Sequence, residues 1–446
     1  MKIKSQKIIY FKIGFILLLI LLLLIPNGLL QGLIWERQSL SENTKKEIAM
    51  TWGGAQNMYG PVLSVPYYFD ETYKDGTVFR NSGWYHLLPN NLNINGDLNP
   101  EIKKLGIYEA IVYEADLKVD GDFNLKEFEK IKHEEAIIEF DKAILSASVE
   151  DINGISKDIT GNFNGSKFKF EKGTPINKIF YRGGFHHTLK LDKDKELINF
   201  DFEVGLKGTE NMSFTPFGAT TQINLKSDWP SPSFKGRSPQ SEISDEGFTC
   251  TWKLNEHNRT FPAAFQNDNA KLVGNSSFGV NLIHGVDHYQ KNMRSAKYAM
   301  LIIALTFMVF FFFEIMYKNK IHPIQYSLIG LALSLFYYLL LSFSEHIPFS
   351  YSYLIASFAT ISMISLYSLK VIEKKNSVFV LFAILVGLYT YIFVLLQLED
   401  YALIAGSVGL FVILSTIMYL SRNMDWYNLG VQDKGISEEL SVDIKS

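Results

Sequence analysis

Histidine and carboxylate side chains come close together just before the second long apolar stretch of this sequence. His284, Asp287 and His288 carry imidazole and carboxylate groups, which can bind a divalent metal. Such residues beside an apolar stretch are usually solvated, and we favour that interpretation. His186 and His187 are adjacent on a predicted strand, so their side chains point to opposite faces and suit joint metal binding poorly. We therefore predict no metal and no cofactor.

A second set of polar groups borders the apolar run that extends from His322 to His346. His322 and Gln325 stand at one edge, and Glu345 and His346 stand at the other. If this run crosses a bilayer, about 30 Å separates the two edges, so these groups cannot act on one substrate atom. We interpret them as markers of the membrane boundary. A pH-sensitive contact at Glu345 and His346 is the alternative, because histidine titrates near neutrality.

Common catalytic and nucleotide-binding motifs are missing from the sequence. It contains no G-x-S-x-G elbow, no H-E-x-x-H, no P-loop and no G-x-G-x-x-G loop. Its one cysteine, Cys250, excludes an intrachain disulfide and a multi-cysteine metal site, and a lone thiol is most simply buried. The net charge of −3 suggests no nucleic-acid partner. We predict a protein that is not an enzyme; a hydrolase whose Ser, His and acidic groups meet only on folding is an alternative.

The elements that position these groups begin with a predicted membrane anchor. Four lysines precede an apolar run at residues 13–35, which is about long enough to cross a bilayer. No A-x-A-like cleavage site follows, so we predict an uncleaved signal anchor with Trp35 at the membrane interface. Pro26 and Gly28 are expected to kink or loosen this helix.

Five further apolar stretches follow a long, more polar region, and we predict that each crosses the membrane. They occupy approximately residues 298–317, 324–343, 352–369, 378–397 and 402–420. None carries Lys, Arg, Asp or Glu near its centre, which weighs against an ion or proton pathway. Small residues at four-residue spacing suit close helix packing, and they are Ser352, Ala356, Thr360, Ala402, Ala405, Gly406 and Gly409.

Charges in the connectors predict the direction of these spans. Lysines occupy alternate connectors, at Lys318, Lys320, Lys370, Lys374 and Lys375, and Arg422 follows the last span. The other short connectors carry Glu345, Glu399 and Asp400 without any Lys or Arg. The positive-inside rule then places residues 1–12 and 422–446 in the cytoplasm and residues 36–296 outside. Lys291, Arg294 and Lys297 oppose this bias, but long translocated domains are exempt from the rule.

The region between the first two spans reads as a mostly β domain. KFKFEKG and ELINFDFEVGLKG alternate apolar and polar residues, and turn clusters such as PNNLNINGDLNP interrupt such runs. The segment SENTKKEIAMTW is an exception and could start a helix at Ser41 or Asn43. We therefore expect a bundle of six transmembrane helices with a large, sandwich-like β domain inserted between the first and second helices, at residues 36–296.

An aromatic and proline-rich run, DWPSPSFKG, is the most distinctive feature of this predicted domain. Pro230 and Pro232 restrict the backbone on either side of Ser231, and Trp229 and Phe234 supply large apolar surfaces. The simpler interpretation is a rigid loop that covers the β core. The alternative is a docking surface for an envelope partner, since rigid aromatic side chains make good interface anchors.

Glu314 is an unusual acidic residue at the cytoplasmic end of the second predicted span. It stands four residues before Lys318, a spacing that favours an ion pair on one helix. Alternatively, it could meet Gln325 across the short KNKIHP connector and hold two helices together.

Several segments of this chain resemble the CreD-type inner-membrane proteins of bacteria, also called cell envelope integrity proteins. The segments are KKLGIYEAIVYEADLKVDGDF, LKSDWPSPSFKG, SDEGFTCTW, AKYAMLIIALTFMVFFFFE, HPIQYSLIGLALSLFYYLLLSFSEHIPF, DYALIAGSVGLF and SRNMDWY. The resemblance implies a Gram-negative inner-membrane protein whose large domain is periplasmic and which supports envelope integrity during stress. It supplies no catalytic residue that could be carried over.

Together these observations favour a non-enzymatic protein that acts through its periplasmic domain. We expect the lipid bilayer as a partner, and contacts with envelope-biogenesis proteins are a further expectation. The alternative function is a transporter or channel for a small or lipid-linked envelope component, which predicts a polar cavity within the bundle. The oligomeric state stays open.

Overall fold

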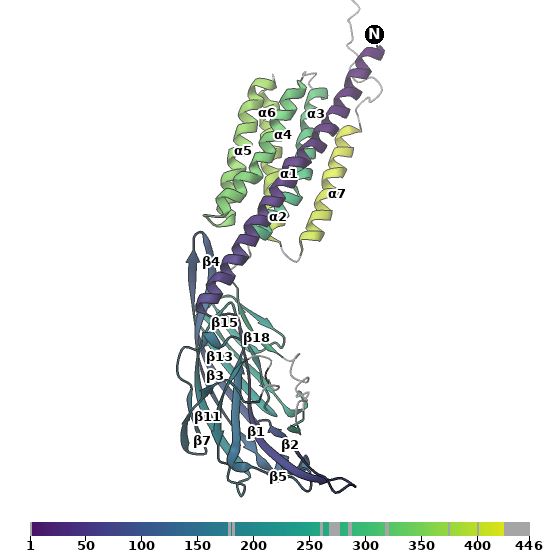
Figure 1. Ribbon diagram of the computed structural model, residues 1–446. Coiled ribbons are helices and arrows are strands. Elements are labelled where there is room, and N and C mark those ends of the chain that lie inside the picture. Colours follow the sequence, from purple (N-terminus) through teal and green to yellow (C-terminus); the bar gives the residue numbers. More distant parts are fainter. Residues whose placement is uncertain are drawn as a thin grey trace, which may run out of the picture. The chain divides into compact units, whose positions relative to one another are not determined.

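The computed structural model describes residues 2–176, 180, 183–258, 262–266, 277–283, 288–316, 321–372, 375–398 and 401–422. The chain divides into two compact units. One comprises Met1–Leu40 and Val286–Ser446, and the other comprises Ser41–Gly285. Apolar helices thus flank a large β-rich domain in the sequence, and the predicted fold class is confirmed (Figure 1).

The first helix, α1 (Lys2–Trp52), contributes residues to both units. Lipid offers no hydrogen-bond partners, so an apolar run is stable there as a helix that pairs its own backbone groups. The helix is unbroken through Pro26, whose carbonyl accepts a hydrogen bond from Tyr338 Oη at 3.0 Å. It also continues past Trp35 to Trp52, so the segment SENTKKEIAMTW is helical as expected, but no separate helix starts at Ser41 or Asn43. The Glu, Lys and Ala residues of that segment are strong helix formers and extend the same helix.

Six helices follow the β-rich domain in the sequence. They are α2 (His288–Lys297), α3 (Ala299–Met316), α4 (Pro323–Ser344), α5 (Phe349–Val371), α6 (Lys375–Gln397) and α7 (Ala402–Ser421). Among the described residues, α1 and α4 to α7 are each long and apolar enough to cross a membrane. The pair α2 and α3, bent by 42° at its junction, makes a sixth span when the two are counted together.

The sequence-based limits of the β-rich domain, 36–296, are wider than the compact unit Ser41–Gly285. The difference at the later limit is α2, which belongs to the helical unit and is hydrogen-bonded to its helices. Asn292 Nδ2 donates to Ser344 Oγ of α4 at 2.6 Å. Arg294 donates to the carbonyls of Leu395 and Leu398, at 3.2 and 2.8 Å.

Two large sheets make up the β-rich unit. The ten-stranded sheet has the order β14–β18–β12–β1–β6–β10–β9, with β2 and β5 paired to β1 and β17 paired to β2. Its strands are β1 (Gln56–Thr72), β2 (Val78–Leu87), β5 (Ile137–Ile138), β6 (Ala143–Val149), β9 (Glu171–Lys172), β10 (Gly184–Leu189), β12 (Asn211–Thr215), β14 (Pro232–Lys235), β17 (Ala264–Gln266) and β18 (Phe278–Leu282).

The eight-stranded sheet has the order β15–β16–β13–β3–β4–β11–β7–β8. Its strands are β3 (Asn91–Leu105), β4 (Tyr108–Asn124), β7 (Thr160–Phe163), β8 (Ser166–Lys169), β11 (Leu197–Thr209), β13 (Thr220–Ser227), β15 (Gln240–Ser244) and β16 (Gly247–Leu254). Most pairs are antiparallel, while β1–β12 and β3–β13 are parallel. Short 3₁₀ turns cover Leu125–Lys130, Phe140–Lys142, Ile152–Gly154 and Glu256–Asn258.

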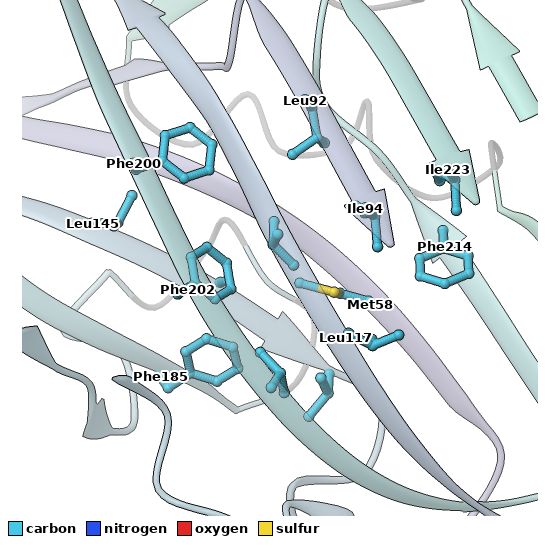
Figure 2. Close-up of a cluster of buried hydrophobic side chains, with 14 of the residues drawn as sticks. Met58, Leu92, Ile94, Leu117, Leu145, Phe185, Phe200, Phe202, Phe214 and Ile223 are labelled. Carbon is cyan, nitrogen blue, oxygen red and sulfur yellow. The ribbon is translucent and has the colours of Figure 1, made fainter. Parts of the chain in front are cut away.

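The apolar faces of the two sheets share one core (Figure 2). Residues alternate between buried and exposed along β3 and β11, as expected for strands with one face against a core. The ten-stranded sheet contributes Met58, Leu145, Phe185 and Phe214, and the eight-stranded sheet contributes Leu92, Ile94, Leu117, Phe200, Phe202 and Ile223. Burial of these side chains is the main stabilising contribution that we assign to this unit.

Candidate functional site

One cluster of charged groups in the membrane unit lies at the start of the apolar part of α1. Lys12 Nζ forms an ion pair with Glu314 of α3, and it also donates to the carbonyl of Ile321 at 3.2 Å. Tyr326 Oη of α4 donates to the other oxygen of the Glu314 carboxylate at 3.1 Å. Glu314 therefore joins three helices, and only 11% of its side chain is exposed.

Gln325 caps the start of α4, whereas the alternative interpretation of the sequence expected it to contact Glu314. Its side-chain oxygen accepts a hydrogen bond from the backbone N–H of His322 at 2.8 Å. The Nδ1 atom of His322 accepts in turn from the N–H of Ile324 at 3.3 Å, which completes a capping box at the start of α4. Lys318, the other expected partner of Glu314, lies outside the described residues.

A second ion pair stands at the far end of the same apolar segment. Arg37 Nε lies 3.7 Å from Glu345 Oε1 at the end of α4, and 11% of the Glu345 side chain is exposed. His346 is exposed, and its backbone N–H donates to the carbonyl of Phe343. The helical rise of α1 puts Lys12 and Arg37 roughly 37 Å apart, slightly more than the hydrocarbon thickness. Both acidic residues thus contact α1, one at each end of its apolar segment.

The interior of the helical unit contains hydroxyl groups instead of charges. No fully buried residue among those described is Lys, Arg, Asp or Glu, but Thr306, Ser352, Thr360 and Ser368 are all buried. The rings of Tyr337, Tyr353 and Tyr389 surround Phe336 in edge-to-face contacts. Tyr353 Oη donates to the carbonyl of Tyr389 at 2.8 Å.

A crevice in this interior brings polar side chains together from α1 and α4. It is lined by Asn27, Leu30, Ala299, Ile303, Ser334, Tyr337 and Tyr338. The crevice is too narrow to admit a water molecule. Asn27 Oδ1, Ser334 Oγ and Tyr337 Oη are buried and have no hydrogen-bond partner among the described residues. This crevice therefore has unused hydrogen-bonding capacity but no room for a water molecule.

Small residues permit the closest helix contacts. Tyr391 Oη of α6 donates to the carbonyls of Ala405 and Gly406 in α7, at 3.0 and 3.2 Å, and its ring fills the space beside Gly409. Gly330 of α4 was not singled out in the sequence. A Cβ atom there would collide with Leu23 of α1 and Phe307 of α3.

The run DWPSPSFKG packs against the β core. Trp229 and Phe234 are half-buried against the core cluster, and Trp229 Nε1 donates to the carbonyl of Ile283 at 3.0 Å. Phe234 meets Phe248 and Trp252 edge-to-face. Pro232 begins β14, which is the edge strand beside β18. The aromatic surfaces are therefore engaged within the domain, while Pro230 and Ser231 are exposed.

The histidines and the cysteine of the β-rich unit have structural surroundings. His186 Nδ1 lies 2.8 Å from the carbonyl oxygen of Gly173, and the ring of His187 stacks on Phe168. Burial lowers the pKa of His187. Cys250 is buried, as predicted, and burial raises the pKa of its thiol to about 12.

His284 and Asp287 lie outside the described residues, so the candidate metal set around His288 has no described geometry. Elsewhere in the described part of the chain, no three His, Cys, Asp or Glu side chains are grouped as metal ligands would be.

Sequence reasoning identified the acidic residues but not the residues that contact them. Lys12 and Glu314 are separated by 302 positions. Lys12 precedes the first apolar run and Glu314 lies near the end of the second, and this was the only indication that both lie at the same membrane boundary. Tyr326 and Arg37 were not singled out either. A search for basic residues directly flanking the first apolar run would have raised both Lys12 and Arg37 as candidates.

Comparison with known proteins places nearly the whole chain in one family. A family model described as inner membrane protein CreD matches residues 8–427. The inner membrane protein CreD of Escherichia coli strain K12 is 33% identical over 436 residues, which cover 95% of each chain.

Proposed function

Because this chain belongs to the CreD family and is a multi-pass inner membrane protein, we propose that it supports the integrity of the cell envelope. We propose further that it does so without enzymatic activity, through the unit Ser41–Gly285 in the periplasm. The observation that carries the proposal is the match of both the helices and the β-rich unit to one family of inner membrane proteins.

The distribution of lysines supports the periplasmic placement. Lys2, Lys4, Lys7 and Lys12 precede the first apolar run, and lysines recur in alternate connectors between the later helices. This pattern favours cytoplasmic chain ends.

Cysteine labelling in whole cells tests this topology with little background, because the only native thiol is buried and poorly ionised. We expect a membrane-impermeant maleimide to label Lys74→Cys in cells whose outer membrane alone has been opened. Arg422→Cys should react only after the inner membrane is opened. The reverse pattern would overturn the orientation.

The role of the β-rich unit is tested in a strain that lacks the gene. The full chain should restore the barrier to a large antibiotic, whereas a variant lacking residues 54–290 should not. Equal amounts of both proteins in the membrane fraction are the required control. Full rescue by the shortened variant would exclude the periplasmic unit as the acting part.

Contact with an envelope-biogenesis protein is the partner that we propose. The exposed part of DWPSPSFKG is suited to capture it, and a photoreactive residue at Ser231 should crosslink such a protein in cells. A matched probe at Lys74, on a different exposed turn, controls for chance encounters. Equal products from the two positions would argue against a contact at this segment.

A transporter is the second candidate, and the buried hydroxyls around Tyr337 are the observation in its favour. If a polar solute passes here, Tyr337→Phe and Ser334→Ala should abolish rescue while the protein remains folded. Retained rescue would leave these groups with a packing role.

A further inference from the structure

The hairpin of β3 and β4 extends beyond the strands on either side of it. Strand β13 follows β3 only as far as Leu98, and β11 follows β4 only as far as Val112. Pairing between β3 and β4 continues to Leu105 and Tyr108. The last part of the hairpin is therefore a two-stranded ribbon that projects from the eight-stranded sheet (Figure 1). Such a ribbon has little stability of its own without a contact surface.

The end of this ribbon exposes three large apolar side chains. Ile102, Leu105 and Ile107 are 40%, 44% and 43% exposed. The nearby charges cancel within the ribbon, because Lys103 pairs with Glu101 at 2.8 Å and Lys104 pairs with Glu109 at 2.6 Å. An exposed apolar end with neutralised flanks favours an apolar partner over a charged one.

The direction of the ribbon follows from its contacts with the last part of α1, inside the same unit. Trp52 Nε1 donates to the carbonyl of Tyr113 at 3.3 Å, and Lys103 Nζ lies 4.4 Å from the centre of the Trp52 ring. Ile48 packs one turn earlier in α1, against Ala110 and Val112. The residues that precede Trp52 in α1 therefore lie beside the residues that precede Tyr113 in β4. Here α1 and the β4 strand run in the same direction, and both lead back toward the turn at Gly106.

The lengths of α1 and β4 inside the unit show how far the turn extends beyond Ser41. About 10 Å of helix separates Ile48 from Ser41, while about 14 Å of strand separates Ala110 from the turn at Gly106. Only the five residues Glu36–Leu40 connect Ser41 to the apolar run that ends at Trp35, and the rise from Trp35 to Ser41 is about 9 Å of helix. The headgroup layer is itself about 5–7 Å deep on each side.

We propose that the end of the β3–β4 hairpin, residues 102–108, inserts into the interfacial layer of the bilayer. Leu105 and Ile107 are the apolar anchors, and Tyr108 lies at headgroup level, where aromatic side chains are favoured. The partner is the lipid surface itself, and the paired charges make the contact independent of anionic lipid.

Fluorescence quenching in vesicles tests this contact with the full chain. Leu105→Cys carries an environment-sensitive dye, and the wild type, whose buried Cys250 stays unlabelled, is the blank. Val78→Cys is the control. Val78 is 60% exposed and lies at the turn between β1 and β2, on a different hairpin of the unit. Lipid-attached nitroxide should quench the dye at 105 about twofold or more, since the probe then lies in the headgroup layer. Soluble iodide should quench mainly the dye at 78.

Each other result overturns the proposal. If iodide quenches both positions equally, the hairpin end is in water. If neither quencher reaches position 105, a protein surface covers it instead. Quenching in phosphatidylcholine vesicles should match that in vesicles with added phosphatidylglycerol, and a signal in the anionic vesicles alone would exclude apolar anchoring.

A matched pair of variants separates insertion from folding. With the dye at Lys104→Cys, replacing Leu105 and Ile107 by Asp should abolish quenching by the lipid nitroxide. Replacing Val78 and Phe79 by Asp should leave that quenching unchanged. In both proteins Cys250 should stay protected from maleimide, which shows that the β core is intact. Unchanged quenching in the first variant would remove these residues as anchors.

Discussion

The β-rich unit and the helical unit differ in the side chains that form their interiors and their outer faces. In the β-rich unit the shared core is apolar, and residues such as Asn91 and Asp122 pair on the outer face, at 2.7 Å. In the helical unit Phe358 and Leu403 are 76% and 85% exposed, whereas Ser352 and Thr360 are buried.

This difference follows from the medium around each unit. Burial of apolar side chains away from water is favourable, so the sheets are held together mainly by their core. Lipid is as apolar as leucine, so helices associate through close packing and hydrogen bonds between them. The same substitution should therefore have different consequences in the two units, and the following predictions test that contrast.

The largest difference is expected for phenylalanine. Phe202 is 1% exposed and meets Phe170 edge-to-face, so Phe202→Ala should destabilise the β-rich unit by about 3–5 kcal/mol. Phe358→Ala, on the outer face of α5, should change stability by about 0.5 kcal/mol or less. The midpoint of Cys250 maleimide labelling against urea measures the first effect, and helical circular dichroism measures the second. Equal losses would contradict the contrast.

The second largest loss of stability is expected where a glycine is packed closely against neighbouring helices. Gly330→Ala places a methyl group against Leu23 and Phe307, and we expect a loss of about 1–3 kcal/mol. Gly387→Ala is the matched control because no atom lies near its added methyl group, and it should be neutral or slightly stabilising. The melting temperature in detergent distinguishes the two variants. If both melt alike, α4 does not depend on close approach at Gly330.

The two ion pairs of α1 should differ by a smaller amount. Glu314→Gln weakens contacts to both Lys12 and Tyr326, so it should cost about 1–2 kcal/mol. Glu345→Gln removes a 3.7 Å contact with the more exposed Arg37 and should cost less than about 1 kcal/mol. Melting temperatures and rescue of the deletion strain are the measurements. Unchanged folding and rescue by Glu314→Gln would exclude a specific role for this charge.

The smallest effect is expected at the surface of the β-rich unit. Arg80 donates two hydrogen bonds to Asp70, at 2.8 and 2.9 Å, and both side chains are exposed. These bonds lower the pKa of Asp70, so any stability they supply is present above the ordinary Asp pKa and is lost as the pH falls through the lowered value. Arg80→Ala should leave the melting temperature at pH 7 unchanged within error. A clear decrease would show that exposed pairs matter in this unit.

Local patterns were sufficient to predict which segments are helices and which form the β domain. Uniformly apolar runs predicted the spans, and α3 and α4 lie close to the predicted limits of 298–317 and 324–343. Alternation along ELINFDFEVGLKG predicted one buried face, which β11 has. The continuity of SENTKKEIAMTW with the first apolar run was missed, because the polar part of α1 lacks the apolar signal that marks a span. Glu314 was chosen correctly as a residue to inspect, but its partners were not.

By itself the sequence determined the medium of each segment, because transfer of a side chain between water and lipid depends mainly on residue type. It also determined where polar residues border the apolar runs, including Gln325, Glu345 and His346. Only the tertiary structure decided which distant residues meet. Lys12 with Glu314, Leu23 with Gly330, and the parallel pairing of β1 with β12 all join positions far apart in the chain. Hydrophobic patterning selects a face but no specific neighbour, since many surfaces satisfy an apolar face equally well.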